Sequence, residues 1–590
     1  MRRLITRMLP TFALFLVLVA SVVQAAPSAQ ERFGTLESLS AYFPKDTMLY
    51  AATRTDANVI ASLDRLVQTV ASQLPAGTIP AGFPTTLTTA LDLFIKQQAG
   101  GGTFADTVQP WLGDTLAVGI YPAIRSAGGR IVIKITDPKA AQQAVLKTLR
   151  GWSSRDADGY TLLSNSNDRN QIAIYPDVMV IYSWSDDVGP QQTPAVMPNV
   201  TANTYYTTAL ARLPDSNYDM IAFVDTPLML AYNQRQSYHD GDWIVPAAVY
   251  RTLGSTGLGV HIGIDQTLTL DAVQTLGNTV GLDALGVQFT GQGAALNPDI
   301  LQRVPQKAVF VMQAADIGAM VEFAGNSAQS ASKKFQTVLP SIITGLAYSS
   351  SVSTAGIFSS AFGGIINTDW ANVLFANLSG YDYASEIRPL LSGNSAFFLT
   401  LNPSYNPNSP TFVNREPFDG ALLFEASDAQ AAQQFVRKLQ RELAIDIYSS
   451  GDQNAVRIQE AVLPTGAVGM SLAVYGETGQ PFDQFTAAAQ DKWLVIGTAS
   501  AVKQVLSGDG LGFDTTSSAL LPNAGAAFYM NLPSAQSPQW TTFMRSDPGN
   551  TALQFLPYFV QDLAVSAAGT DKNDVLLRLK LTLPCGDNCG

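Results

Sequence analysis

Apolar and polar positions recur at two spacings along this chain. Apolar residues three and four positions apart predict amphipathic helices over 56–74 and 86–98, and again after Asp137 and Asp428. Between and beyond these helices lie short apolar or alternating runs that are typical of strands: 116–121, 131–135, 160–163, 172–181, 260–264, 268–273, 563–567 and 575–583. Strands joined by short turns and interrupted by helices favour mostly antiparallel sheets of the α+β class.

One strand-to-helix segment occurs twice. The residues from Asp137 to Val145 read DPKAAQQAV and those from Asp428 to Val436 read DAQAAQQFV. Each aspartate stands where an N-cap carboxylate accepts the first free amide hydrogens, and Pro138 suits the first helical position. In each copy one apolar stripe follows at helical spacing: Ala141, Ala144, Val145, Thr148 and Leu149, and then Ala432, Phe435, Val436, Leu439 and Leu443.

Further segment pairs follow in the same order on both sides of this unit. They match 43–50 with 304–311, 108–113 with 387–393, 178–181 with 493–496, and 213–214 with 521–522. The common order predicts an internal duplication, with two homologous α+β domains that each hold a mostly antiparallel sheet and packed helices. The expected division is a leader over 1–25, a first repeat over 26–297, a second over 298–584 and a cysteine-containing tail over 585–590.

The N-terminus has the pattern of an export signal. Arg2, Arg3 and Arg7 precede an apolar run over 11–23, and Val23-Gln24-Ala25 offers a cleavage site before the mature chain. The sequence therefore predicts a secreted, periplasmic or cell-surface protein. If the leader is not cleaved, the same segment becomes a membrane anchor. No later segment is long and apolar enough to predict a membrane span.

Composition and charge narrow the class of partners. Hydrophobic residues make up 46% of the chain and charged residues 14%, which suits large buried cores. The net charge is −12 and no basic stripe stands out, which argues against nucleic acid as a partner.

Cys585 and Cys589 are the only cysteines, and both lie in the tail. In an oxidising compartment a small terminal disulfide loop is the expected state. A metal pair is disfavoured because the further ligands of a structural zinc site are missing nearby. Two free thiols are the remaining alternative.

Three sequence blocks and the leader resemble the DUF3352 family of exported bacterial proteins of unknown function. The blocks read FPKDTMLYAATRTD, VQPWLGD and ITDPKAAQQAV. The resemblance covers most of the mature chain and implies an exported protein of this architecture. It transfers no catalytic residue, ligand or partner.

The two histidines give little support to an enzyme. His261 lies in an alternating run and is interpreted as a strand residue, whereas His239 precedes an Asp-Gly turn. A Ser-His-Asp triad would need residues brought together by the fold, and no Gly-x-Ser-x-Gly elbow supports one.

The best enzyme hypothesis is a secreted serine hydrolase of the penicillin-recognising type. Ser330 and Lys333 fit S-x-x-K, with Ser330 as nucleophile and Lys333 assisting the removal of its proton. Ser404-Tyr405-Asn406 fits the downstream S-x-N element, but no K-[ST]-G strand follows. This hydrolase is the alternative to a binding function.

Two weaker signals concern metals and aromatic contacts. The acidic stretches 156–159 and 571–574 mimic calcium loops but lack the final acidic ligand, so turns are expected there. Aromatic residues in polar surroundings suggest sugar or peptide contacts: Tyr205, Tyr206, Tyr238, Trp243, Tyr381 and Tyr383.

These observations together favour an exported, non-enzymatic binding or scaffold protein of the cell envelope or the exterior. Its expected partner is an envelope protein, a glycan or a small ligand. No cofactor, no metal and no membrane span after signal cleavage are expected.

Overall fold

The computed structural model describes the chain in separated ranges. They are residues 32–73, 84–99, 101–123, 127–149, 151–165, 168–182, 198–237, 253–263, 267–276, 295–316, 383–406, 408–409, 417–450, 456–475, 481–514, 520–521, 523–532, 560–569 and 574–583.

Two units divide the chain, and each is described by itself. The first comprises Met1–Gly281, Tyr558–Val560 and Thr570–Gly590, and the second comprises Leu282–Pro557 and Gln561–Gly569. The first unit thus takes in the C-terminal strand of the chain.

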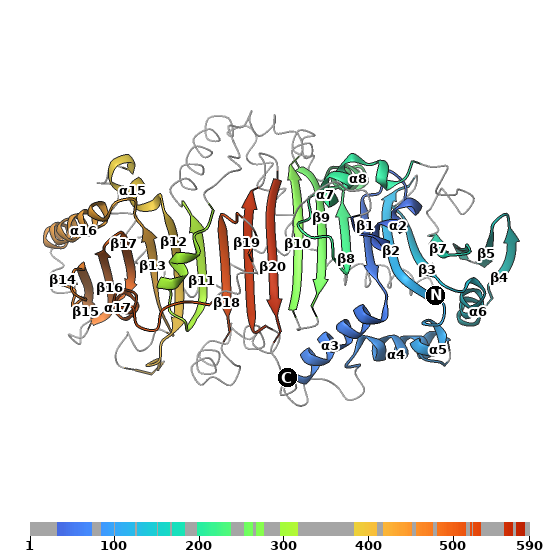
Figure 1. Cartoon of the computed structure of the whole chain (residues 1–590), viewed down its shortest axis with the longest axis horizontal. Coiled ribbons are helices and arrows are strands. Elements are labelled where there is room, and N and C mark those ends of the chain that lie inside the picture. Colours follow the sequence, from blue (N-terminus) through green and yellow to red (C-terminus); the bar gives the residue numbers. More distant parts are fainter. Residues whose placement is uncertain are drawn as a thin grey trace. The chain divides into compact units, whose positions relative to one another are not determined.

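Strands dominate both units (Figure 1). Those of the first are β1 (Leu49–Arg54), β2 (Leu112–Pro122), β3 (Ala127–Ile135), β4 (Ser153–Ala157), β5 (Tyr160–Asn165), β6 (Asp168–Ile174), β7 (Val178–Tyr182), β8 (Met220–Val224), β9 (Leu253–Ile262), β10 (Thr267–Leu276) and β20 (Asp574–Thr582). Those of the second are β11 (Ala308–Ala315), β12 (Asn394–Leu401), β13 (Phe418–Glu425), β14 (Val456–Glu460), β15 (Val468–Tyr475), β16 (Pro481–Gln490), β17 (Trp493–Thr498), β18 (Ala526–Asn531) and β19 (Asp562–Gly569).

Helical segments connect these strands. In the first unit they are α2 (Thr35–Ser38), η1 (Leu39–Tyr42), α3 (Ala57–Gln73), α4 (Leu87–Ala99), α5 (Phe104–Thr107), α6 (Pro138–Thr148), η2 (Val200–Ala202), α7 (Thr204–Ala211) and α8 (Thr226–Ser237). In the second they are η3 (Pro298–Arg303), the π-helical turn η5 (Tyr383–Ile387), α15 (Arg388–Leu391), α16 (Ala429–Ser450) and α17 (Ala499–Ser507).

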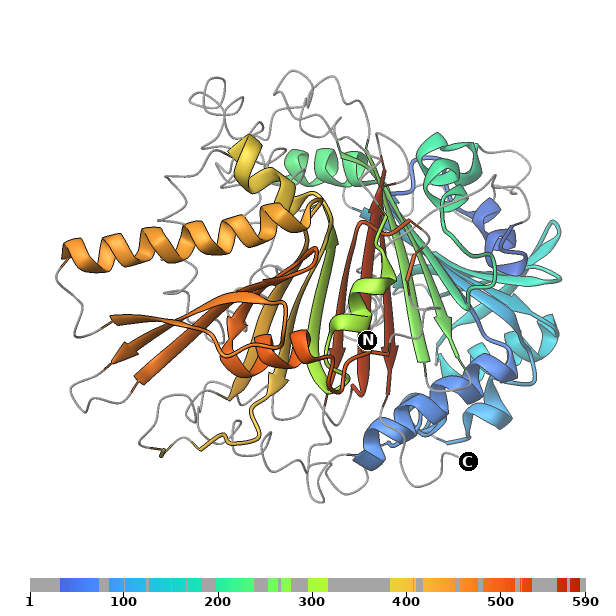
Figure 2. The same ribbon diagram turned by 60° about the vertical axis from the view of Figure 1, so that its left-hand side comes forward.

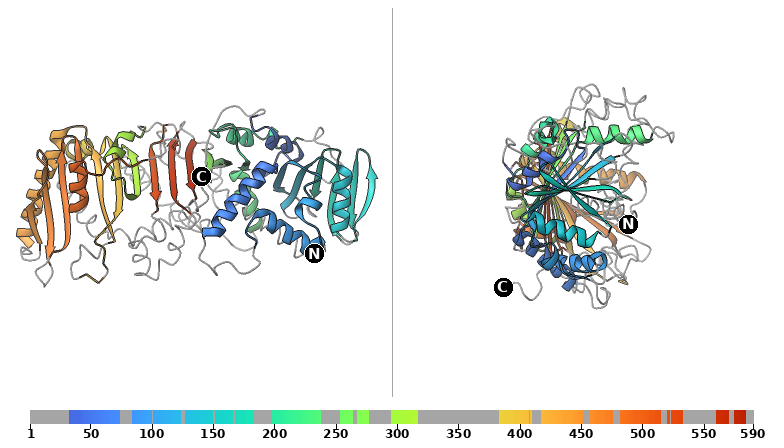
Figure 3. Two further views of the ribbon diagram at one scale, coloured as in Figure 1. Left: turned by 60° about the horizontal axis from the view of Figure 1, so that its bottom comes forward. Right: turned by 90° about the vertical axis from the view of Figure 1, so that its right-hand side faces the viewer.

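All strand pairs in the first unit are antiparallel. The neighbours run β4-β5-β6-β7-β3-β2-β1-β8-β9-β10-β20. Helix α6 packs over β3, β5, β6 and β7 through a core that includes Ala141 and Leu163 (Figure 3). A second core gathers around Tyr50, Tyr206 and Phe223, where α7 and the short helices close over the central strands.

The second unit has the antiparallel order β14-β15-β16-β17-β13-β12-β11-β18-β19. Helix α16 packs on β14 to β17 (Figure 2), and α17 packs on β13, β16 and β17. The α16 face buries the stripe that the sequence predicts: Ala432, Phe435, Val436, Leu439 and Leu443.

The expected fold class is wrong. Two homologous α+β domains with separate sheets were predicted, whereas the twenty described strands belong to one antiparallel sheet with few helices. The C-terminal strand β20 pairs with β10 along Thr267 to Thr275, so the first unit is completed by the end of the chain. Apolar spacing identifies the strands and their buried faces but does not say which strands become neighbours, and this is why the prediction failed.

The predicted helix caps are confirmed. The Asp137 carboxylate accepts hydrogen bonds from the amides of Lys139 and Ala140 at 2.9 and 3.0 Å. The Asp428 carboxylate accepts one from the Gln430 amide at 3.0 Å. Each strand therefore passes into a helix whose first turn is capped by the aspartate at its start.

Membrane-spanning helices are not found in the part of the chain that the structure describes, where no helix combines the required length and hydropathy.

Candidate functional site

A pocket of about 310 Å³ lies on α16, beside η5. Its lining consists of Ser385, Glu386, Ala431, Gln434, Phe435, Arg437, Lys438 and Arg441. Two features of the local sequence position this lining. Because Asp428 caps α16 and its apolar stripe is buried, the adjoining edge of the helix presents Gln434, Lys438 and Arg441 one turn apart.

The other wall comes from η5 and α15. The Arg388 guanidinium, at the start of α15, holds the Asp316 carboxylate with contacts of 2.8 and 3.0 Å. Pro389 suits the first turn of α15, and its carbonyl accepts a hydrogen bond from the Ser427 amide at 2.9 Å. These contacts tie α15, which continues directly from η5, to the end of β11 and to the end of β13, the strand that precedes α16. A π-helical turn at the pocket wall fits the tendency of such turns to occur at functional sites.

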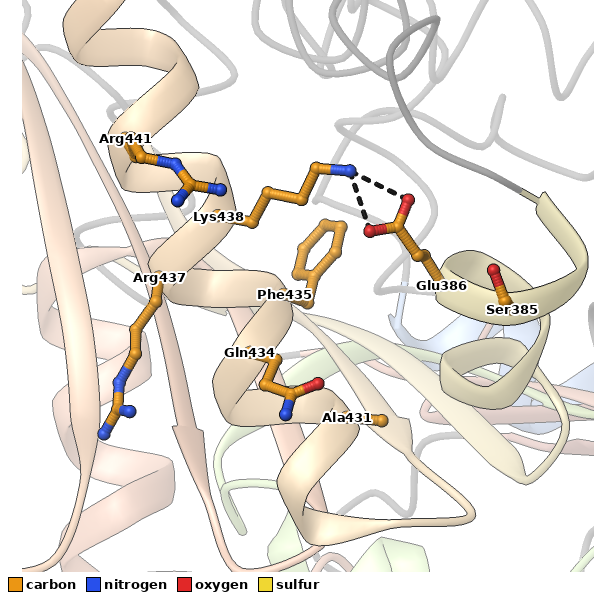
Figure 4. A pocket seen from close by; sticks show the side chains of 8 residues that line it. All are labelled: Ser385, Glu386, Ala431, Gln434, Phe435, Arg437, Lys438 and Arg441. Atoms are coloured by element: carbon orange, nitrogen blue, oxygen red, sulfur yellow. Dashed lines mark hydrogen bonds and ion pairs between the residues drawn. The ribbon is translucent and has the colours of Figure 1, made fainter.

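Lys438 and Glu386 form an ion pair across the pocket (Figure 4). The Lys438 ammonium donates to both Glu386 carboxylate oxygens, at 2.7 and 2.8 Å. The two side chains are 22% and 35% exposed, so solvent screens the attraction and the pair adds about 0–1 kcal/mol to stability. The ion pair can therefore open, or exchange one partner for another charged group, at a small cost in free energy.

Positive charge is in excess around this pocket. Among the described residues of the lining, three are cationic, Arg437, Lys438 and Arg441, and one is a carboxylate, Glu386. The Glu442 carboxylate lies 3.8 Å from Lys438, one turn further along α16. Within the described residues neither arginine forms an ion pair. Figure 4 shows Arg441 on the Glu386 side of the helix, whereas Arg437 extends the other way.

The chemistry available to this lining is recognition by charge and hydrogen bonding. Ser385 and Gln434 supply a hydroxyl and an amide, and the buried ring of Phe435 supplies an apolar wall. Among the described residues, the lining holds no histidine, no cysteine and only one carboxylate. Across the described residues, no three metal-ligating side chains gather.

His261 lies in β9, which confirms its interpretation as a strand residue. Its Nδ1 is 3.1 Å from the Asp219 carboxylate, which also accepts the Ile262 amide at 2.8 Å. The Arg54 guanidinium lies 3.9 Å from the other oxygen of the Asp219 carboxylate.

A fully buried carboxylate, that of Asp271, lies in the same unit. Arg578 of β20 donates to both its oxygens at 2.7 and 2.8 Å, and the Tyr218 hydroxyl donates at 2.7 Å. Burial and the neighbouring Asp271 carboxylate raise the pKa of Tyr218 well above its ordinary value, so the phenol stays protonated. The hydrogen bonds to Asp271 raise the pKa of Arg578. This cluster joins β10 to β20 and to the segment just before β8.

Most candidate residues from the sequence lie outside the described residues. These are Ser330 and Lys333 of the hydrolase hypothesis, His239, the leader over 1–25, and the predicted disulfide pair Cys585 and Cys589.

The S-x-N element and one acidic stretch are described, and both are turns. The Ser404 amide donates to the Asn402 side chain at 2.9 Å, and the Asn408 amide donates to Asn406 at 3.0 Å. The predicted turn at Asp158-Gly159 joins β4 to β5 and is confirmed, with a glycine φ of +83°.

The aromatic residues that the sequence suggests for sugar or peptide contacts lie partly within and partly outside the described residues. Tyr206 is fully buried in the first core, whereas Tyr205 is 42% exposed. Tyr238, Trp243 and Tyr381 lie outside the described residues.

Sequence reasoning missed the pocket on α16. The polar spacing of Gln434, Lys438 and Arg441 was the available signal, but nothing in the sequence places η5 opposite that edge.

Comparisons with known proteins add a distant likeness only. No family model and no curated protein matches this chain, so the resemblance to DUF3352 stays a prediction. Among solved structures, crystal form III of TP0453 is 11% identical, with a TM-score of 0.22, over 40% of this chain and 80% of that one. Crystal form IV of the same protein is also 11% identical, with a TM-score of 0.21, over 40% of this chain and 79% of that one. At these TM-scores nothing about the site follows from them.

Proposed function

We propose that the protein is a non-enzymatic binding protein of the cell envelope or the exterior, and that it binds a small polar ligand in the pocket on α16. The observation that carries this proposal is the pocket itself. Its volume lies at the lower end of the range for small-molecule sites, and polar groups converge on it from two elements beside one buried aromatic ring. The leader sequence supports the extracytoplasmic location.

The composition of the lining favours binding over catalysis. Hydrolysis needs a nucleophile or activated water together with a base of suitable pKa. In the described part of the lining the one serine is Ser385, and the only carboxylate, that of Glu386, is held by Lys438. Guanidinium, ammonium, amide and hydroxyl groups instead suit the orientation of a bound polar molecule.

Native mass spectrometry of the protein recovered from its own exported fraction tests the proposal. We expect a chain that begins at Ala26 and carries a reproducible mass that denaturation releases. Gln434→Trp fills the pocket from an exposed helix position and should abolish the bound mass. Ala444→Trp, at an exposed position of α16 outside the lining, is the matched control and should retain it.

Three outcomes would overturn the proposal. One is a wild-type chain that carries no releasable mass. The second is a bound mass that survives Gln434→Trp when the variant melts at the wild-type temperature. The third is a substrate turnover that a single substitution abolishes. A chain that still begins at Met1 would contradict the cleaved leader.

A further inference from the structure

We infer that the ligand of the α16 pocket is a small organic anion whose carboxylate or phosphate group is bound by Arg441 and Lys438, in competition with Glu386. This inference rests on the proposed function and names the chemical class of its ligand. It combines the charge of the pocket, the geometry of the Lys438–Glu386 pair and the volume of the site.

The charge of the pocket is opposite to that of the chain. The protein carries a net charge of −12, yet three of the eight described residues of the lining are cationic and one is anionic. Lys438 is balanced by Glu386 and, at 3.8 Å, by Glu442. The excess therefore resides on the two arginines, of which Arg441 lies on the Glu386 side of the helix (Figure 4). The electrostatic potential at this pocket therefore favours an anion, although the protein as a whole is acidic.

The Glu386 carboxylate shows how an oxyanion fits. Both of its oxygens accept from the Lys438 ammonium, at 2.7 and 2.8 Å, so the pocket already accommodates a carboxylate in good geometry. A ligand oxyanion between Lys438 and Arg441 would gain the ammonium together with the planar fork of a guanidinium, which binds carboxylate and phosphate through two parallel hydrogen bonds.

The rest of the lining limits the ligand to a small molecule with an apolar face. A volume of about 310 Å³ admits a molecule of the size of one sugar ring or one amino acid. Phe435 offers the apolar wall, while Gln434 and Ser385 offer hydrogen bonds to hydroxyl or amide groups.

Glu386 acts as an internal competitor in this arrangement. Its carboxylate repels a second anion and occupies the same donor, so it lowers the affinity for the ligand. Removing its charge should tighten binding, whereas removing the charge of Arg441 should weaken it. For a cationic ligand both effects on the affinity would be reversed. For a neutral ligand neither change would alter the affinity.

Isothermal titration of the mature chain with four related probes tests the inference. Glucuronate, glucose 6-phosphate, glucose and glucosamine share one ring and differ in charge, and the first two distinguish a carboxylate from a phosphate. We expect one or both anions to bind and the neutral and cationic sugars to bind at least roughly ten-fold more weakly. Added salt should weaken the binding of the anion.

Three variants assign the effect to the pocket. Arg441→Gln should weaken anion binding by roughly ten-fold, and Glu386→Gln should tighten it several-fold. Lys503→Gln, at an exposed position of α17 outside the lining, removes the same charge as Arg441→Gln and should leave affinity unchanged.

The failures of the two proposals are distinguishable. The anion inference is overturned if neither anion binds up to roughly 10 mM, if the amine binds best, or if Arg441→Gln and Glu386→Gln leave the affinity unchanged. In each of these cases a natural ligand mass that Gln434→Trp abolishes still supports a binding pocket. A mass that Gln434→Trp retains overturns both.

Discussion

Arg578 and Asp271 form a two-pronged ion pair although 307 positions separate them in the chain. The arginine lies on β20 and the aspartate on β10, directly opposite each other in the ladder. The Asp271 side chain is 1% exposed and that of Arg578 16% exposed. The Tyr218 hydroxyl completes the set of donors, so the charge of Asp271 is compensated inside the protein.

We predict that Asp271→Asn destabilises the first unit by about 3–5 kcal/mol, because it leaves the Arg578 guanidinium without its buried partner. Urea unfolding followed by tryptophan fluorescence measures the loss. Lys580→Gln, two residues along β20, removes a charge without a described ion pair and should change stability by at most about 0.5 kcal/mol. A loss for Asp271→Asn no larger than that of the control would contradict the assigned role.

Gly259 provides a second test of the same region. A Cβ at this position would lie 2.6 Å from the Tyr218 ring, because β9 passes directly beneath it. Gly259→Ala should therefore displace Tyr218 and cost about 1–3 kcal/mol through overpacking. The melting temperature reports the change, with Thr269→Ala on β10 as a half-buried comparison. An unchanged melting temperature would show that the ring has room to move.

The helix caps give a prediction that follows from sequence and structure alike. Asp137→Ala removes an acceptor for two amides and should cost about 0.5–2 kcal/mol, as should Asp428→Ala. Asp137→Asn keeps an acceptor and should cost less. Chemical denaturation of the three variants measures the order, and equal losses for alanine and asparagine at position 137 would exclude a capping role.

Glu37 should make stability depend on pH. Burial raises its pKa above 4.5, and backbone hydrogen bonds lower it by a smaller amount. Because the folded pKa exceeds the unfolded one, the folded state holds the proton more tightly. The resulting stability is present below about pH 4.5 and is lost as the pH rises through the folded value.

Glu37→Gln should therefore be more stable relative to wild type at pH 7 than at pH 4. Urea unfolding at both pH values measures this difference. Glu460→Gln, an exposed change of the same chemistry on β14, is the control. A difference between Glu37→Gln and wild type that is the same at both pH values would remove this explanation.

Local features of the fold were predictable and long-range ones were not. The caps at Asp137 and Asp428 and the buried stripe from Ala432 to Leu443 follow from neighbours within a few turns, which the sequence displays directly. The pairing of β10 with β20 depends on residues about three hundred positions apart, and the spacing of apolar residues does not indicate which strands will pair.

In the candidate site, too, the local feature was predictable from the sequence and the long-range contact was not. The polar edge of α16 could be identified from the spacing of Gln434, Lys438 and Arg441. The partner Glu386 lies 52 positions before Lys438 and comes from a π-helical turn, which has no sequence signature comparable to an N-cap. The motifs that sequence reasoning favoured for chemistry, Ser330 and Lys333, fall outside the described residues.

The place of β20 in the first unit sets an order of events during biosynthesis. The other strands of this unit end with β10 at Leu276, whereas β20 begins only at Asp574, after the strands of the second unit. Until that strand arrives, β10 has an unpaired edge and Asp271 lacks its guanidinium. A chain that ends prematurely before Arg578 would therefore expose an open edge to aggregation and proteolysis. The edge of β10 is thus covered only after the strands of the second unit have been synthesised.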